Sequence, residues 1–161
     1  WSLVLDDAGR AKGQAVRAFD SSRMERCPAF SPDGSRVAFE SNRSGTTEVW
    51  VCRSNGSGCS QATQFPGLHA GSPAWSPDGE WIAFDAEEED EGYAIYIVRP
   101  DGGQLQRLAK GAVPRWSRDG QWIYYTSSGV QRLYRGSKTG GDPQEIKGTV
   151  DGAVAGESSD G

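Results

Sequence analysis

The stretch SPAWSPDGEWIAFDA, residues 72–86, predicts a short strand, a tight turn and a second strand. Near-copies occur elsewhere: CPAFSPDGSRVAFES begins at Cys27, VPRWSRDGQWIYYTS begins at Val113, and AGESSDG ends the chain. A hairpin that recurs along one chain indicates a repeat architecture, so the repeat is the first guide to the fold.

The Ser-x-Asp-Gly tetrads begin at Ser31, Ser76, Ser117 and Ser158, a spacing of about 41–45 residues that is typical of propeller blades. Each unit predicts four strands, A to D, separated by turn signals. Three units are whole, over residues 27–63, 73–109 and 114–147, and fragments of a unit stand at 1–26 and 153–161. We therefore expect a single domain over residues 1–161, and we expect it to be an arc of a larger ring. A closed four-bladed ring, with residues 1–19 and 153–161 in one blade, is the alternative.

Apolar residues point to both faces of the predicted strands. In strand B of the second unit, Ile82 and Phe84 share one face and Ala83 points to the other. Sheets that are apolar on both faces are covered on both sides, as in a ring of stacked four-stranded antiparallel sheets. The sequence therefore predicts an all-β partial propeller, and a two-sheet sandwich fits less well because it would leave one polar face per strand.

The segment PAFSPDGSRVAFESNRSGTTEVWVCRSNGSGCSQAT, which starts at Pro28, resembles the blade repeat of the TolB-type, or WD-like, propellers. The resemblance covers nearly the whole chain. It implies a bacterial, periplasmic setting and blades arranged around a channel, but no single function. Propellers of this kind serve as binding proteins, as accessory domains of prolyl-oligopeptidase-like peptidases, and behind winged-helix regulators.

The tetrads are interpreted as turns between strands A and B. Proline presets the backbone, aspartate bonds nearby N–H groups, glycine adopts positive φ, and serine accepts a backbone N–H. Their repetition at one structural place favours a structural role over general acid catalysis for Asp33, Gly34, Asp78, Gly79, Asp119 and Gly120.

The composition excludes several classes of function. The net charge of −5 argues against a nucleic-acid-binding surface, and no apolar run is long enough to cross a membrane. The single histidine, His69, excludes a metal site made of several histidines, and no Gly-x-Ser-x-Gly, P-loop or His-Glu-x-x-His motif is present. We therefore expect no catalytic residue, no metal and no cofactor. NRS at 42–44 and NGS at 55–57 are interpreted as turns.

Cys52 and Cys59 flank Asn55-Gly56. If this dipeptide is a two-residue hairpin turn, Ser54 faces Ser57 and Cys52 faces Cys59, within disulfide range. A bridge would require an oxidising compartment, and Cys27 would remain free. The alternative is two small residues on a hairpin.

Successive turns of a four-stranded meander alternate between the two ends of the sheet. The A–B and C–D turns therefore share one rim, and the B–C hairpins and D–A connections share the other. The second rim varies from unit to unit, and variable loops on a rigid scaffold are where recognition usually resides. We expect a partner site there, at Arg43, His69, Glu87, Glu88, Glu89, Asp90 and Glu91. The acidic run could instead be a solvated loop or a weak divalent-cation site.

The sequence thus predicts a non-catalytic scaffold that binds a protein or peptide partner as part of a larger protein. The alternative is an accessory gating propeller of a prolyl-oligopeptidase-like serine peptidase whose catalytic domain lies outside this chain. A channel enzyme fits least, because the chain offers few inward histidines or carboxylates.

Overall fold

The structure is a computed structural model that describes residues 22–65, 69–89, 91–127 and 132–147. These residues form three four-stranded antiparallel sheets. Blade 1 contains β1 (Glu25–Phe30), β2 (Arg36–Ser41), β3 (Glu48–Arg53) and β4 (Ser60–Gln61). Blade 2 contains β5 (Ala70–Trp75), β6 (Ile82–Glu88), β7 (Gly92–Val98) and β8 (Gln106–Lys110). Blade 3 contains β9 (Ala112–Trp116), β10 (Trp122–Thr126), β11 (Leu133–Ser137) and β12 (Gln144–Glu145).

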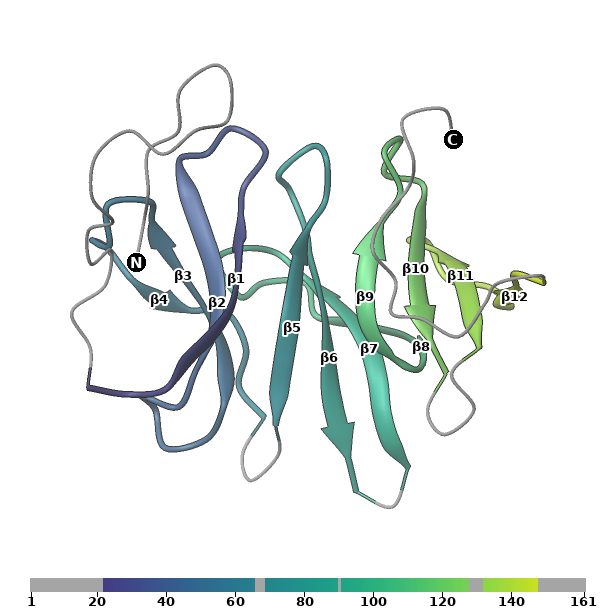
Figure 1. The fold of residues 1–161 in the computed structure, drawn as a ribbon, viewed down its shortest axis with the longest axis horizontal. Helices are drawn as coiled ribbons and strands as arrows, with labels where there is room; N and C mark the ends of the chain where they lie inside the picture. The colour runs from purple at the N-terminus through teal and green to yellow at the C-terminus, as the bar shows by residue number, and fades with distance from the viewer. Residues whose placement is uncertain (1–21, 66–68, 90, 128–131, 148–161) are drawn as a thin grey trace.

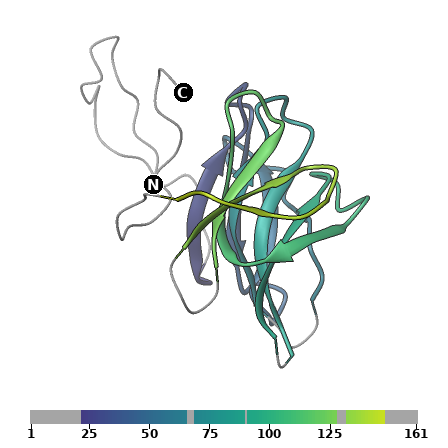
Figure 2. The same cartoon turned by 90° about the vertical axis from the view of Figure 1, so that its right-hand side faces the viewer.

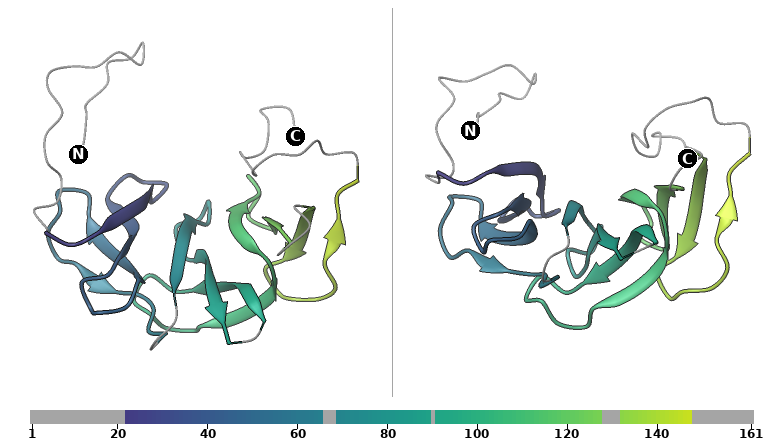
Figure 3. Two further views of the ribbon diagram at one scale, coloured as in Figure 1. Left: turned by 60° about the horizontal axis from the view of Figure 1, so that its bottom comes forward. Right: turned by 90° about the horizontal axis from the view of Figure 1, so that it is seen from below.

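The sheets stand side by side in an open row (Figure 1). Within each blade the strands lie in chain order, and the first strands β1, β5 and β9 contact one another from blade to blade. Seen from below, the blades follow an arc (Figure 3), and Figure 2 looks along the row. The predicted all-β propeller arc is therefore confirmed. Residues 1–21 and 148–161, on which the choice between a larger ring and a four-bladed ring depends, lie outside the described residues.

The hydrophobic core lies between the blades. Ala38, Val49 and Val51 of blade 1 pack against Trp75 and Phe84 of blade 2. A second cluster joins blades 2 and 3 through Ala83, Ile95, Ile97, Ile123 and Tyr125. This is why the strands need apolar residues on both faces: the sheet of blade 2 buries one face against blade 1 and the other against blade 3.

Two kinds of hydrogen bond repeat at the junctions between blades. The indole of Trp75 donates to the carbonyl of Ala29 at 2.9 Å, and the indole of Trp116 donates to that of Ala74 at 3.1 Å. A tryptophan at the end of the first strand thus anchors blades 2 and 3 on the preceding blade, because its ring packs in the junction core while its N–H finds an acceptor.

Buried carboxylates form the second kind of junction bond. Glu40 accepts the backbone N–H of Ser72 at 2.8 Å, and Asp85 accepts that of Val113 at 2.7 Å. Ser72 and Val113 sit at bulges with φ of 51° and 57°, which is costly for residues with a side chain. We infer that these carboxylates help to hold the bulges, because each supplies the acceptor for an N–H at the bulge.

The three tetrads form the same turn. The hydroxyls of Ser31, Ser76 and Ser117 each accept the N–H five residues later at 2.9 Å and donate to the tetrad aspartate. The aspartate accepts the N–H two residues later, and Gly34, Gly79 and Gly120 have φ of 68°, 70° and 69°. The turn is therefore closed by residues within five positions of each other.

Blade 1 contains a disulfide between Cys52 and Cys59, whose Cα atoms are 4.0 Å apart, and Cys27 is a free thiol. The turn between them differs from the predicted one. Arg53, rather than Ser54, pairs with Ser57, since its N–H donates to the Ser57 carbonyl at 2.9 Å. Gly58, at φ 61°, inserts an extra residue after this three-residue loop. The two departures cancel, so Cys52 still faces Cys59.

Candidate functional site

The residues predicted to bind a partner lie toward the end of the blades that carries the B–C hairpins and D–A connections, the lower end in Figure 1. We call this end the hairpin rim, and the opposite end, which carries Ser31–Gly34 and its two copies, the tetrad rim. Asp90 lies outside the described residues.

Arg43 is held inside blade 1. Its guanidinium pairs with Glu25 and lies 5.1 Å from the ring centre of Phe39 and 4.9 Å from that of Trp50. Its Nε donates to the hydroxyl of Ser41 at 3.1 Å. These contacts tie β1 to β2 and β3, so the stem and charge of Arg43 stabilise the blade itself.

Glu88 anchors the acidic hairpin of blade 2. Its carboxylate accepts two bonds from Arg107, at 2.7 and 2.9 Å, and one from the hydroxyl of Tyr96 at 2.7 Å. These donors, Arg107 first, lower the pKa of Glu88 to about 2, although partial burial opposes them. Glu91 adds an ion pair with Lys110 at 2.9 Å. The outer strand β8 therefore neutralises part of the acidic run.

Glu87, Glu89 and Glu91 are exposed, and of these Glu87 and Glu89 take part in no ion pair within the described part of the chain. The backbone of Glu87 is fixed, because its N–H donates to the carbonyl of His69 at 2.8 Å. The structure thus joins the B–C hairpin of blade 2 to the connection that enters β5. Arg43, on blade 1, makes its contacts elsewhere.

His69 lies close to a junction carboxylate. A Cβ on Gly71 would stand 2.6 Å from Glu40 Oε1 and 3.1 Å from His69 Cε1, so a larger residue there would require these side chains to shift. His69 Nδ1 is buried and has no hydrogen-bond partner among the described residues. Burial raises the pKa of the nearby Asp85, while hydrogen bonds from the N–H of Val113 and from the side chain of Ser72 oppose the rise.

A groove runs along the inner strands of all three blades. It has a volume of about 440 Å³ and is lined by β1, β5 and β9, with Pro28, Pro73, Trp75 and Arg115 among its side chains. Cys27 opens into it, and partial burial together with Glu40 raises the pKa of this thiol to about 11. The sequence analysis missed this axial groove because its walls come from three separate units.

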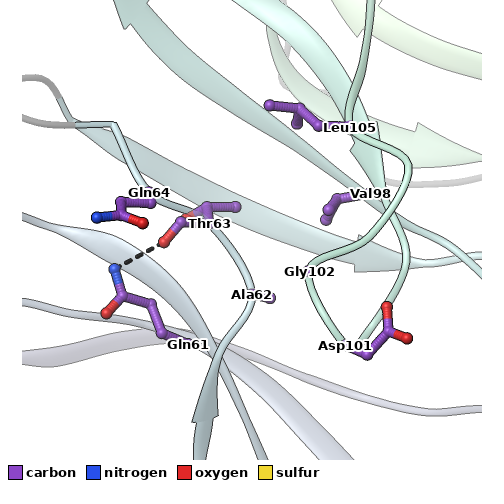
Figure 4. A pocket seen from close by; sticks show the side chains of 8 residues that line it. All are labelled: Gln61, Ala62, Thr63, Gln64, Val98, Asp101, Gly102 and Leu105. Carbon is purple, nitrogen blue, oxygen red and sulfur yellow. Dashed lines mark hydrogen bonds between the residues drawn. The ribbon is translucent and has the colours of Figure 1, made fainter.

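A second groove, of about 420 Å³, lies between blades 1 and 2 on their outer side (Figure 4). Gln61 crosses one wall, with its side-chain amide donating to the carbonyl of Thr63 at 2.7 Å. Gly102 forms the other wall, where a Cβ would stand 3.3 Å from the Ala62 carbonyl. Leu105, 48% exposed, borders the opening. This groove is shallow and its lining is polar. The lining carries no pair of groups suited to acid–base chemistry.

Two further observations bear on the class of site. In the described ranges, no three His, Cys, Asp or Glu side chains are placed to hold a metal ion. The same ranges contain no helix with the length and apolar character needed to span a membrane.

Comparison with known proteins gives a consistent result. The TolB β-propeller domain model matches residues 7–160. The Tol-Pal system protein TolB of Anaeromyxobacter dehalogenans is 34% identical over 61 residues, which are 38% of this chain and 14% of that protein.

Solved structures agree on the fold. TolB from Acinetobacter baumannii superposes with a TM-score of 0.75 at 22% identity, over 99% of this chain and 40% of that one. Puromycin hydrolase superposes with a TM-score of 0.66 at 17% identity, over 88% of this chain and 24% of that one. The chain spans less than half the length of each of these relatives. By the extent of the family match, the chain belongs to the TolB β-propeller domain family.

Proposed function

We propose that this chain is a non-catalytic binding module, part of a larger protein, that holds a protein or peptide partner on its hairpin rim. The observation that carries the proposal is the anchored acidic hairpin. Arg107 and Tyr96 fix Glu88, and the His69 carbonyl fixes the backbone of Glu87. Glu87 and Glu89 are thereby presented to solvent on a rigid support, which reduces the entropy lost on binding.

The partner that suits this surface is basic. Exposed carboxylates on the hairpin rim would attract lysine or arginine side chains, and the association would weaken with salt. Within the proposed site, Glu87, Glu89 and Asp90 contact the partner. His69, Glu88, Glu91 and Arg43 support the rim, since each of their described contacts is internal.

We further propose that the module works outside the cytoplasm. The Cys52–Cys59 disulfide supports this setting, because such bonds persist in oxidising compartments. The match to a Tol-Pal system protein supports the same setting and a partner that is itself a protein.

The test uses the intact 161-residue chain as the target. Partners are selected against it from a displayed library of random dodecapeptides. Enriched peptides should be rich in lysine and arginine. Glu89→Lys should lower their affinity about tenfold, by replacing an attraction with a repulsion. Asp142→Lys is the matched control, because Asp142 is also an exposed acid but lies on the tetrad rim.

Equal losses from Glu89→Lys and Asp142→Lys, or enrichment of neutral peptides only, would contradict the proposal. The same peptides also address the alternative, an accessory propeller of a serine peptidase. That role predicts that the peptides bind without regard to the hairpin rim and are cleaved only when the parent's catalytic domain is present.

A further inference from the structure

The face of blade 3 that points away from blade 2 differs chemically from the corresponding faces of blades 1 and 2. We call the face on which the following blade packs the trailing face. At its centre Ala38 pairs with Val51 in blade 1, and Ala83 pairs with Ile97 in blade 2. In blade 3 the corresponding pair is Tyr124 with Arg135. Where blades 1 and 2 each have an apolar pair, blade 3 thus has a tyrosine and an arginine.

The two described junctions show what an apolar trailing face accommodates. Trp75 packs in one cluster with Ala38 and Val51, and Trp116 packs in one cluster with Ala83 and Ile97. Each indole N–H also donates to a carbonyl in the first strand of the preceding blade. Each of these tryptophans immediately precedes a tetrad, so this position in the repeat determines what enters the face of the preceding blade.

The next copy of this position is Glu157, which immediately precedes the tetrad at Ser158. Glutamate cannot donate to a carbonyl as an indole does, and its charge would be costly against an apolar pair. Thus a charged residue appears in the fourth repeat where the trailing face before it has gained a charge of opposite sign.

Arg135 is placed to receive a carboxylate. Its guanidinium lies 4.5 Å over the ring of Trp122, and its Nε donates to Gln144 at 3.0 Å. These contacts orient the plane of a group that has five N–H donors in all, and a planar guanidinium binds carboxylates with two parallel bonds. On the trailing face, Arg135 is therefore held through its Nε and through the ring of Trp122.

We propose that the trailing face of blade 3 is a docking surface for the segment that begins the fourth repeat, residues 153–157, and that Arg135 recognises the carboxylate of Glu157. Glu157 lies outside the described residues, and its place in the repeat comes from the sequence. The third junction would then depend on charge and be sensitive to salt, whereas the first two depend on tryptophans packed in the junction cores. The proposal does not depend on partner binding at the hairpin rim.

The test is a charge exchange in the 161-residue chain, followed by amide hydrogen exchange in β10 and β11. Glu157→Arg and Arg135→Glu should each speed exchange in these strands by about fivefold, the size expected for loss of one partly exposed ion pair. The exchanged pair, E157R/R135E, should return to within about twofold of the wild-type rate. The effect of the single variants should shrink in high salt.

The control variant is E157R/R132E. Arg132 is close to β11 but pairs with Glu145 at 3.4 Å, so its reversal should not rescue Glu157→Arg. Amides of β6 and β7 report whether each variant keeps its fold. If Glu157→Arg loses protection there as well, the neutral Glu157→Gln replaces it and should give a smaller change of the same sign. Additive effects in the exchanged pair, equal rescue by R132E, or unchanged exchange in both single variants would overturn the proposal.

Discussion

Acidic residues have different structural roles at the two rims. At the tetrad rim, Asp33, Asp78 and Asp119 each bind groups two residues away in their own turn. Toward the hairpin rim, Asp85 and Glu88 bind groups 28 and 19 residues away. The first set closes local turns and is the same in every blade. The second set joins segments that only the folded chain brings together: the bond of Asp85 recurs with Glu40 at the first junction, while the contacts of Glu88 belong to blade 2.

The largest expected effect breaks the long-range set. Asp85→Ala should lower the free energy of unfolding by about 2–3 kcal/mol, because it leaves the N–H of Val113 without an acceptor beside a strained bulge. Asp85→Asn keeps an oxygen acceptor and should recover most of this loss. Denaturant unfolding at neutral pH measures both. An equally destabilised Asn variant would show that the charge, and not the acceptor, holds the junction.

The pH dependence of the contribution that Asp85 makes to stability sharpens the test. Burial raises the pKa of Asp85, so the folded protein binds this proton more tightly than the unfolded chain does. The cost of the buried charge should therefore fall as pH is lowered from the raised pKa toward the usual value of 3.8. Asp85→Asn should lack this contribution.

A smaller effect is expected from the local set. Ser76→Ala should cost about 1–2 kcal/mol, because the hydroxyl accepts the N–H of Trp81 at 2.9 Å and is buried. Ser31→Ala and Ser117→Ala should cost about the same, since their turns have the same bonds. Unequal losses in the three blades would mean that the turns depend on their surroundings after all. Denaturant midpoints of the three variants decide this.

The smallest effect concerns Glu88. Its pKa in the folded protein is about 2, below the usual value of 4.5, so its stabilising contribution is present above pH 4.5 and is lost as pH falls toward 2. Glu88→Gln should lower stability at neutral pH by about 1 kcal/mol or less, because the pair is partly exposed. The variant and the wild type should converge in acid, as thermal melts against pH would show. A constant difference at all pH values would assign the effect to packing.

The correct predictions rest on short-range patterns. The alternating apolar residues and the tetrads each depend on neighbours in the chain, so the all-β propeller arc could be inferred from 161 letters. The turn after Arg53 was predicted wrongly, because Asn-Gly usually forms a two-residue turn while here Gly56 and Gly58 both take positive φ. Cys52 and Cys59 still face each other only because the three-residue loop and the extra residue Gly58 offset one another.

The charged partners of the candidate site could not be predicted in this way. Nothing in the acidic run indicates that Arg107 pairs with Glu88, because the two are brought together by the pairing of β7 with β8. The axial groove is hidden for the same reason, since its walls come from three blades.

The sequence by itself determined the repeat, its four-stranded unit and its turns, because each of these depends on residues close together in the chain. Only the tertiary structure decided which carboxylates are buried, which are neutralised and which face solvent. Burial and charge pairing arise where distant segments meet, and in this protein the segments meet at the junctions between blades and along the outer strands of blades 2 and 3.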